Sequence, residues 1–202
     1  MDKKHIQSLA DAVLGRIFVP LEASGRHVHL SAQQCNTLFG GALTPERPLS
    51  QPGQFLSKER VSIIGPKGRF DHVAVLGPAR KEAQIEISLT DSKVLGISAP
   101  IRQSGDVEKT PGIIVEGPRG RIGIQQGVMI AQRHLHLTPT AAQMFAVKDK
   151  QIVKLQTYTA RPTLFQEVVV RVSPDFSNAA HLDYDEANAC GMKSGDLGRI
   201  IP

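Results

Sequence analysis

Two six-residue stretches of this chain nearly repeat each other, and each contains two histidines. Residues 26–31 and 133–138 both read Arg-His-aliphatic-His-Leu-(Ser or Thr), so they hold four of the chain's seven histidines. On a β-strand, residues i and i+2 point to the same face of the sheet. Each stretch therefore predicts a short strand that presents two imidazoles side by side, where both can bind one metal ion.

A third copy, residues 181–183, repeats only the His-Leu-cap part of this pattern. In all three copies a preferred helix N-cap residue follows the leucine: Ser31, Thr138 and Asp183. An apolar-periodic stretch comes next in each case. The predicted helices cover residues 32–39, 139–146 and 184–190. His29, His136 and His181 would then each end a strand just before a helix begins.

Packing alone offers a simpler interpretation of the repeat. The second and third copies continue alike, through a helix, an aliphatic-Lys pair, a turn and a strand, which is typical of one supersecondary unit used twice. Two such units can pack as a pseudo-symmetric barrel. Packing does not explain five histidines, because a buried imidazole needs a metal ion or a hydrogen-bond partner. We therefore expect a barrel scaffold that also carries a metal centre.

Most of the remaining pattern is typical of β-structure. Between residues 58 and 131, short apolar or alternating runs are separated by turn signals such as residues 65–68 and 117–120. This density of short strands favours barrels over a doubly wound sheet. Residues 40–58 are rich in glycine and proline, and we expect them to form an inserted loop or broken helix.

The N-terminal segment predicts an amphipathic helix over residues 2–17. Apolar residues recur there at helical spacing: Ile6, Leu9, Ala10, Val13 and Ile17. Such a helix can pack on its own domain, or it can detach and bind a groove on a partner. The pattern alone leaves these two alternatives open.

Composition limits the classes of function. The net charge of +5 is scattered rather than clustered, which indicates attraction for a small anionic substrate. Aromatic residues make up only 4% of the chain, so base stacking on aromatic platforms is not expected. No signal peptide or membrane-spanning run is visible, which predicts a reducing, cytoplasmic location. There, Cys35 and Cys190 are expected to be core residues rather than a disulfide or a nucleophile.

Two further side chains can complete the site. Glu86 lies on the polar face of the alternating run 84–89. A glutamate in that position is most often solvated, but its carboxylate can also join imidazoles around zinc. Arg80 follows a Gly-Pro-Ala turn and offers a planar fork to phosphate, although it is one of many arginines.

These residues resemble those of a known family, the PduL-type phosphate propanoyltransferases (phosphotransacylases) of bacterial microcompartments. The likeness covers nearly the whole chain, and its motifs are residues 25–31, 77–80, 84–88, 133–138 and 181–183. The resemblance implies a mainly β fold, with two β-barrels capped by short helices and a dinuclear zinc site between them. It also implies reversible conversion of acyl-CoA and phosphate into acyl phosphate and CoA, with a propanoyl or acetyl group.

The resemblance also assigns roles to single residues and segments. Arg80 would bind phosphate during catalysis. The implied ligands of two zinc ions are His27, His29, Glu86, His134, His136 and His181. The implied segments are an encapsulation helix over residues 1–18, a first barrel of residues 19–24 and 132–202, and a second barrel of residues 25–131 with the loop 40–58.

The expected partners follow from the same resemblance. Residues 2–17 would dock on a microcompartment shell or cargo and place the protein inside the compartment. A homo-oligomer, such as a dimer, is expected, whereas nucleic acid and membrane are not expected partners. The substrates would be acyl-CoA, CoA and phosphate.

A site of this kind predicts direct attack of phosphate on the thioester in a ternary complex, because bound metal can orient both reactants and stabilise the oxyanion. Two other classes can use similar residues. One is a metal-dependent thioesterase or phosphoesterase, and the other is a non-catalytic structural metal protein of a microcompartment. Six candidate ligands for two metal ions leave coordination positions open, which favours catalysis.

Overall fold

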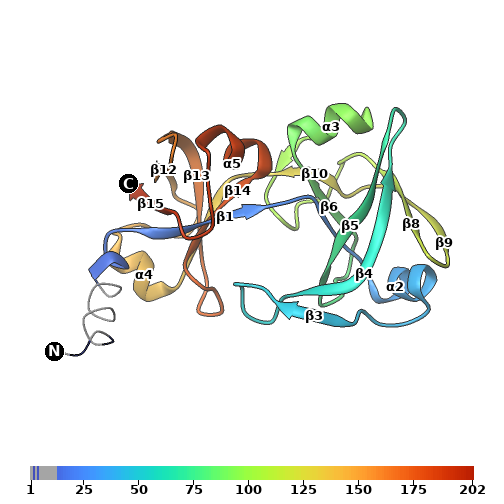
Figure 1. The fold of residues 1–202 in the computed structure, drawn as a ribbon, viewed down its shortest axis with the longest axis horizontal. Coiled ribbons are helices and arrows are strands. Elements are labelled where there is room, and N and C mark those ends of the chain that lie inside the picture. The colour runs from blue at the N-terminus through green and yellow to red at the C-terminus, as the bar shows by residue number, and fades with distance from the viewer. Residues whose placement is uncertain (1, 3, 5–12) are drawn as a thin grey trace. The chain divides into compact units, whose positions relative to one another are not determined.

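The computed structural model describes residues 2, 4 and 13–202 (Figure 1). This part of the chain is mainly β, as predicted, and contains four short helices, α2 to α5. The helix predicted over residues 2–17 lies mostly outside the described residues. By its internal contacts the chain divides into two compact units. Unit 1 comprises residues 1–23, 133–182 and 186–202, and unit 2 comprises residues 24–132 and 183–185.

Unit 1 is built on a closed barrel of six strands. In order around the barrel they are β1 (Val19–Ser24), β14 (Ala179–Asp183), β11 (His134–Leu137), β13 (Leu164–Val172), β12 (Ile152–Tyr158) and β15 (Leu197–Ile201). Helices α4 (Pro139–Met144) and α5 (Tyr184–Cys190) follow β11 and β14 along the chain. The barrel interior is apolar, and side chains such as Leu135, Leu155 and Val170 are fully buried in it.

Unit 2 is built on a nine-stranded sheet that curls into a half-barrel. Its strand order is β7 (Ile101–Arg102), β10 (Val128–Ala131), β6 (Gln84–Ile87), β2 (His27–His29), β5 (Arg69–Gly77), β4 (Phe55–Ile64), β8 (Ile113–Gly117) and β9 (Gly120–Ile124). The ninth strand, β3 (Pro45–Pro48), pairs with β4. The two end strands, β7 and β9, are not neighbours in this order, so this second barrel is a curled half-barrel rather than a closed one.

The histidines lie on strand faces that point away from the apolar cores. In β11, Leu135 and Leu137 are fully buried in the barrel core, so His134 and His136 point to the opposite face. In β2, the side chain of Val28 belongs to the core of unit 2, and the two flanking histidines point away from it. The alternation of aliphatic residues and histidines therefore decides which face of each strand carries the imidazoles.

The helices predicted after the histidine strands are present. Helices α2 (Ala32–Phe39) and α5 cover the predicted residues, and α4 ends two residues earlier than predicted. Ser31 caps α2 with a capping box: its hydroxyl accepts a hydrogen bond from the Gln34 N–H at 3.2 Å, and its own N–H donates to Gln34 Oε1 at 2.8 Å. None of the helices in the described part of the chain is long and apolar enough to cross a membrane.

Two segments differ from the sequence prediction. Residues 84–89 were expected to form one strand, but β6 ends at Ile87, and helix α3 (Leu89–Leu95) begins after Ser88. The Ser88 hydroxyl accepts from the Asp91 N–H at 3.2 Å, and the Ser88 N–H donates to the Asp91 carboxylate at 3.2 Å. This capping box stops the strand. Residues 40–58, expected to be a loop, contain β3 and the start of β4.

Candidate metal centre

Unit 2 brings His27, His29 and Glu86 together. Strand β2 carries both histidines and pairs antiparallel with β6, so that His27 lies directly opposite Glu86. One ligand atom from each side chain lies within 4.8 Å of the other two. The Nε2 atom of His27 is 3.5 Å from Oε1 of Glu86. All three side chains are buried, so they form a compact polar cluster, which we call the unit 2 triad.

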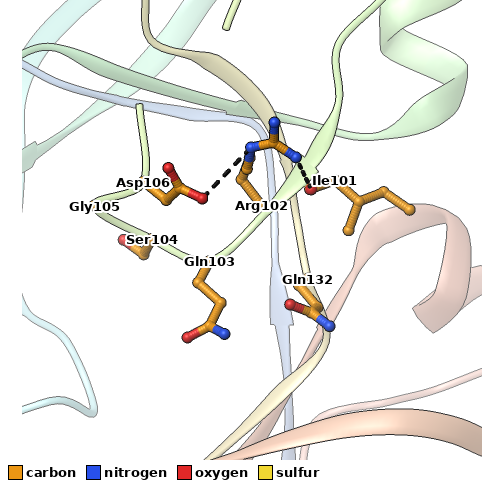
Figure 2. Close-up of a pocket in the computed structure, with 7 residues that line it drawn as sticks. All are labelled: Ile101, Arg102, Gln103, Ser104, Gly105, Asp106 and Gln132. Atoms are coloured by element: carbon orange, nitrogen blue, oxygen red, sulfur yellow. Dashed lines mark hydrogen bonds and ion pairs between the residues drawn. The ribbon is translucent and has the colours of Figure 1, made fainter. Parts of the chain in front are cut away.

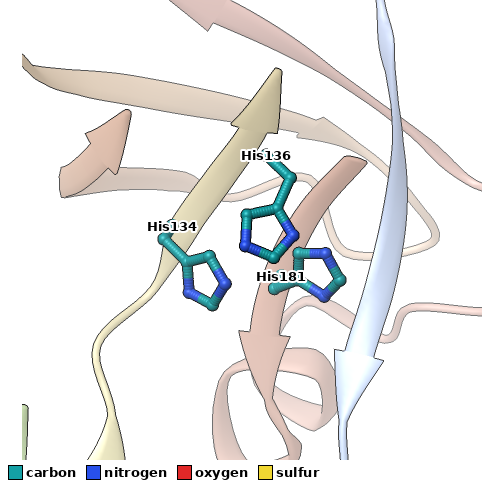
Figure 3. Close-up of side chains that lie close together, drawn as sticks. All are labelled: His134, His136 and His181. Carbon is teal, nitrogen blue, oxygen red and sulfur yellow. The ribbon is translucent and has the colours of Figure 1, made fainter. Parts of the chain in front are cut away.

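Unit 1 gathers three histidines in the same way (Figure 3). Strand β11 supplies His134 and His136, and antiparallel pairing with β14 places His181 directly opposite His134. The ring centroid of His134 is 4.7 Å from that of His136 and 4.9 Å from that of His181. One nitrogen from each ring lies within 4.8 Å of the other two. The three rings converge as Figure 3 shows, and we call them the unit 1 triad.

The two triads share one construction. In each, a short strand supplies two histidines, and the residue opposite the first histidine on the antiparallel neighbour supplies the third group. The third group differs, because it is a carboxylate in unit 2 and an imidazole in unit 1. The six side chains that the sequence marked as metal ligands thus fall into two groups of three, one in each unit.

Hydrogen bonds and burial set the protonation of the unit 2 histidines. Nδ1 of His27 lies 2.7 Å from the Gly25 carbonyl oxygen, so Nδ1 donates its proton there and leaves Nε2 to bind a metal. Burial lowers the pKa of His27, but the charge of Glu86 and the hydrogen bonds to Glu86 and Gly25 outweigh it and raise that pKa. Burial, then the charges of His27 and Arg80, lower the pKa of His29 well below its ordinary value. His29 is therefore neutral, as a metal ligand must be.

The donor atoms of both triads fit a metal ion. Nδ1 of His29 is buried and has no hydrogen-bond partner among the described residues, an arrangement that a bound cation would relieve. Three imidazoles, or two imidazoles and a carboxylate, are sets that zinc uses while it keeps a fourth position open for a reactant. Either triad can therefore hold a zinc-type ion with catalytic coordination.

Two residues beside the unit 1 triad were missed from the sequence. Phe176 stacks on His136, with ring centroids 4.0 Å apart and planes inclined by 25°. Arg171 lies directly opposite His136 on β13, and its guanidinium carbon is 5.7 Å from the centroid of the Phe176 ring. Neither residue belongs to a repeated motif, so no sequence pattern marked them.

Arg80 lies next to the unit 2 triad. Its backbone N–H donates to the carbonyl of Leu30, just after strand β2, at 2.8 Å. Its Nη1 atom donates to Oγ of Ser104 at 3.3 Å. The side chain is half-buried, and its positive charge acts on both His27 and His29. A planar guanidinium in this place can bind an anion close to the candidate metal ligands of the unit 2 triad.

The arginines that precede the histidine pairs are held by acidic residues of helices. Arg26 makes a bidentate ion pair with Asp91 of α3, at 2.5 and 3.0 Å, and its guanidinium lies 3.5 Å over the Phe70 ring. Arg133 forms an ion pair with Glu186 of α5. Each arginine thereby fixes the start of a histidine strand to a helix, which is a structural role.

The two cysteines lie in the apolar cores, as predicted. Cys35 belongs to the core of unit 2 and Cys190 to that of unit 1. Burial raises the pKa of each thiol. The thiolate is the reactive form, and a raised pKa disfavours it at neutral pH. Neither cysteine is therefore activated as a nucleophile.

The fold and the two triads define a mainly β protein with two histidine-rich sites, one buried and one partly buried, each able to hold a metal ion. Residues 20–193 match the family model described as phosphate propanoyltransferase. The chain belongs to this family, as its motifs predicted, and it is an acyltransferase.

Relatives of the chain support this assignment over almost its full length. A phosphate propanoyltransferase of Listeria monocytogenes is 47% identical over 100% of this chain and 97% of its own. One from Clostridioides difficile is 48% identical over 97% of each chain. One from Thermotoga maritima is 50% identical over 88% of this chain and 86% of its own.

Proposed function

We propose that the protein interconverts acyl-CoA plus phosphate and acyl phosphate plus CoA with the help of two zinc ions, one held by each triad. The observation that carries the proposal is a pair of equally constructed triads in a member of the phosphate propanoyltransferase family. The proposed ligands are His27, His29 and Glu86 for one ion, and His134, His136 and His181 for the other. The expected acyl groups are propanoyl and acetyl.

When bound, zinc would polarise the thioester carbonyl and stabilise the negative charge that develops on its oxygen. Arg80 would orient phosphate, because its planar N–H groups match two phosphate oxygens, and its contact with Ser104 restrains the guanidinium. A phosphate oxygen then attacks the carbonyl carbon, and the carbon–sulfur bond breaks to release the CoA thiolate. Holding both reactants in one complex removes much of the entropic cost of their encounter.

Direct attack by phosphate is favoured over an acyl-enzyme intermediate. An acyl-enzyme would need a protein nucleophile, and a thiol is the most reactive candidate. Both cysteines are packed in the apolar cores, and burial raises their pKa values. A single displacement in a ternary complex requires neither of them.

The proposal extends to the partners of the chain. We infer that residues 2–17 dock on a microcompartment shell or cargo and that the enzyme works there as a homo-oligomer. The support is the helical spacing of apolar residues in that segment together with the family resemblance. Deleting residues 1–18 is expected to leave specific activity near wild type and to reduce large assemblies and the encapsulated fraction. Loss of folding, or unchanged encapsulation, would contradict this inference.

The reaction is tested by following thiol release from propanoyl-CoA and acetyl-CoA with and without phosphate, together with the zinc content of the chain. We expect release to require phosphate, acyl phosphate to be trapped by hydroxylamine, and about two zinc ions per chain. Chelation should abolish activity, and added zinc should restore it. Equal release without phosphate, with the free acid as product, would identify a thioesterase. Full activity without zinc would show that the reaction does not need the metal.

A further inference from the structure

A buried amide lies beside the unit 2 triad. Gln84 is 2% exposed and sits on β6 directly opposite His29, two residues before Glu86 and on the same face. Its Nε2 atom donates to Oε1 of Glu86 and, at 2.8 Å, to Oγ of Ser104. Its Oε1 atom accepts from the N–H of Gly105 at 2.7 Å. Both N–H groups and the carbonyl of this side chain are therefore used.

The three contacts fix the direction of the amide. A carboxamide has two N–H donors on one side and an acceptor oxygen on the other. The backbone N–H of Gly105 can only donate, so it selects the oxygen of Gln84 and turns the nitrogen toward Glu86. A reversed amide would set its oxygen against the Glu86 carboxylate, where two acceptors repel. Gln84 thus presents a donor to one defined oxygen of Glu86.

The unit 1 triad has an alanine, not a glutamine, at the equivalent position. There, Ala179 lies opposite His136, just as Gln84 lies opposite His29. The third group of unit 1 is a rigid imidazole, whereas Glu86 carries two equivalent oxygens on a broad terminal torsion. A donor that holds one oxygen is needed only where the third group is a carboxylate.

We propose that Gln84 is a positioning residue that orients the carboxylate of Glu86 as a metal ligand and couples it to Ser104 and Arg80. This inference rests on the proposed function, in which the unit 2 triad holds zinc. The Ser104 hydroxyl accepts from Gln84 and, at 3.3 Å, from Nη1 of Arg80. Hydrogen bonds to a ligating carboxylate set its direction and its basicity. One amide and one hydroxyl therefore connect the metal ligand to the phosphate-binding arginine.

The same chain segment supplies a matched control. Ser104 and Gly105 line a cavity of about 530 Å³ together with Gln103 (Figure 2). The side chain of Gln103 carries the same amide as Gln84, but it is exposed and stands apart from Ser104 in Figure 2. Replacing each glutamine with methionine removes an amide while keeping the length of the side chain.

The test measures the zinc affinity of the full chain by competition with a chelator, in wild type, Gln84→Met and Gln103→Met. In Gln84→Met we expect one of the two sites to weaken by about 10–100-fold and the other to stay unchanged. Gln103→Met should bind as wild type. In a His134→Ala background, which keeps only the unit 2 triad intact, Gln84→Met should weaken the remaining site. A purely structural role would instead lower the melting temperature without a site-selective loss.

A second pair of variants tests the network from its other end. Ser104→Ala should weaken the same zinc site by a smaller factor, and Ser104→Thr, which keeps the hydroxyl, should restore it. Wild-type affinity at both sites in Gln84→Met would overturn the inference and leave the proposed function intact. A wild-type chain without zinc affinity would overturn both. Should Gln84→Met fail to fold, unchanged zinc affinity in Ser104→Ala overturns the inference.

Discussion

Arg80 illustrates how neighbouring residues restrain a single side chain in one conformation. Its backbone is fixed next to the end of β2, and its guanidinium is restrained by the Ser104 hydroxyl. A long side chain that is already ordered loses less rotamer entropy when it binds an anion. The ring of His27 is restrained in the same way, by a hydrogen bond from Nδ1 to the Gly25 carbonyl.

Replacing Arg80 should therefore act on the phosphate reactant. We expect Arg80→Ala to raise the KM for phosphate or lower kcat, with little change in the affinity for CoA. Arg80→Lys should also be impaired, because a lysine lacks the planar fork that binds two oxygens. Steady-state kinetics with phosphate and CoA varied separately provide the measurement. Unchanged phosphate dependence in both variants would assign this role to another residue. Arg26 and Arg133 would be examined next, although their ion pairs with Asp91 and Glu186 already give them a structural role.

The buried cysteines lead to a prediction about covalent catalysis. The double variant Cys35→Ala and Cys190→Ala should retain turnover, because direct attack needs no thiol. Its free energy of unfolding should fall modestly, since two small core side chains are shortened. Activity, zinc content and a urea unfolding curve would be measured on the same preparation. A folded, fully metallated but inactive double variant would favour an acyl-cysteine intermediate instead.

For single residues, the sequence indicated the candidate metal ligands but not the residues that contact and support them. The histidine pairs were visible because the i, i+2 geometry of a strand is local. Glu86 was visible only as one of two interpretations of a polar strand face. Gln84 contacts Ser104 and Gly105, about 20 residues further along the chain, and such contacts have no local signature in the sequence.

Among the elements, helix α3 has a task beyond covering the sheet of unit 2. Its residue Asp91 completes the capping box with Ser88 and also holds Arg26, the residue before the first histidine pair. One carboxylate thus joins the start of a helix to the start of strand β2. The ion pair is partly shielded from solvent, with 10% of the Asp91 side chain exposed.

Removing this carboxylate should destabilise unit 2. We expect Asp91→Ala to lower the free energy of unfolding by about 2–4 kcal/mol, from the lost cap and the lost charged hydrogen bonds. Asp106→Ala serves as control, because its ion pair with Arg102 is exposed and should contribute less than about 1 kcal/mol. Urea unfolding of both variants provides the comparison. Equal stability of the two would show that the Asp91 contacts do not contribute to folding.

Three of the four helices in the described part of the chain could be predicted because a residue type preferred at helix N-caps directly follows a His-Leu pair. Helix α3 could not be separated from the alternating strand pattern, although Ser88 and Asp91 carry the Ser-x-x-Asp spacing of a capping box. Strand β3 was hidden in a segment rich in proline, since an edge strand tolerates residues that a central strand excludes. Local signals therefore located the elements near the site better than those at the sheet edge.

At the scale of the whole molecule, the two triads belong to separate compact units. A substitution can therefore disrupt one triad and leave the other intact. His134→Ala should bind one zinc ion instead of two and lose most activity, while its circular dichroism stays as in wild type. Zinc stabilises the residues that bind it according to its concentration and affinity. Hydrogen exchange should then show zinc protection of β2 and β6 in this variant, but no longer of β11 and β14. Two bound ions in His134→Ala would contradict the assignment.

The antiparallel pairing of β2 with β6 also governs where the length of the chain can vary. Deleting Val28 would leave two adjacent histidines that point to opposite faces, and inserting one residue before Glu86 within β6 would turn its carboxylate into the core. Residues can be added in the connections between the two strands without this effect, since a loop absorbs them. Insertions and deletions should therefore be permitted in residues 40–44 and 49–54, outside β3 and β4, and excluded from the strands that carry the triads. This gives a rule for recombining segments of related chains.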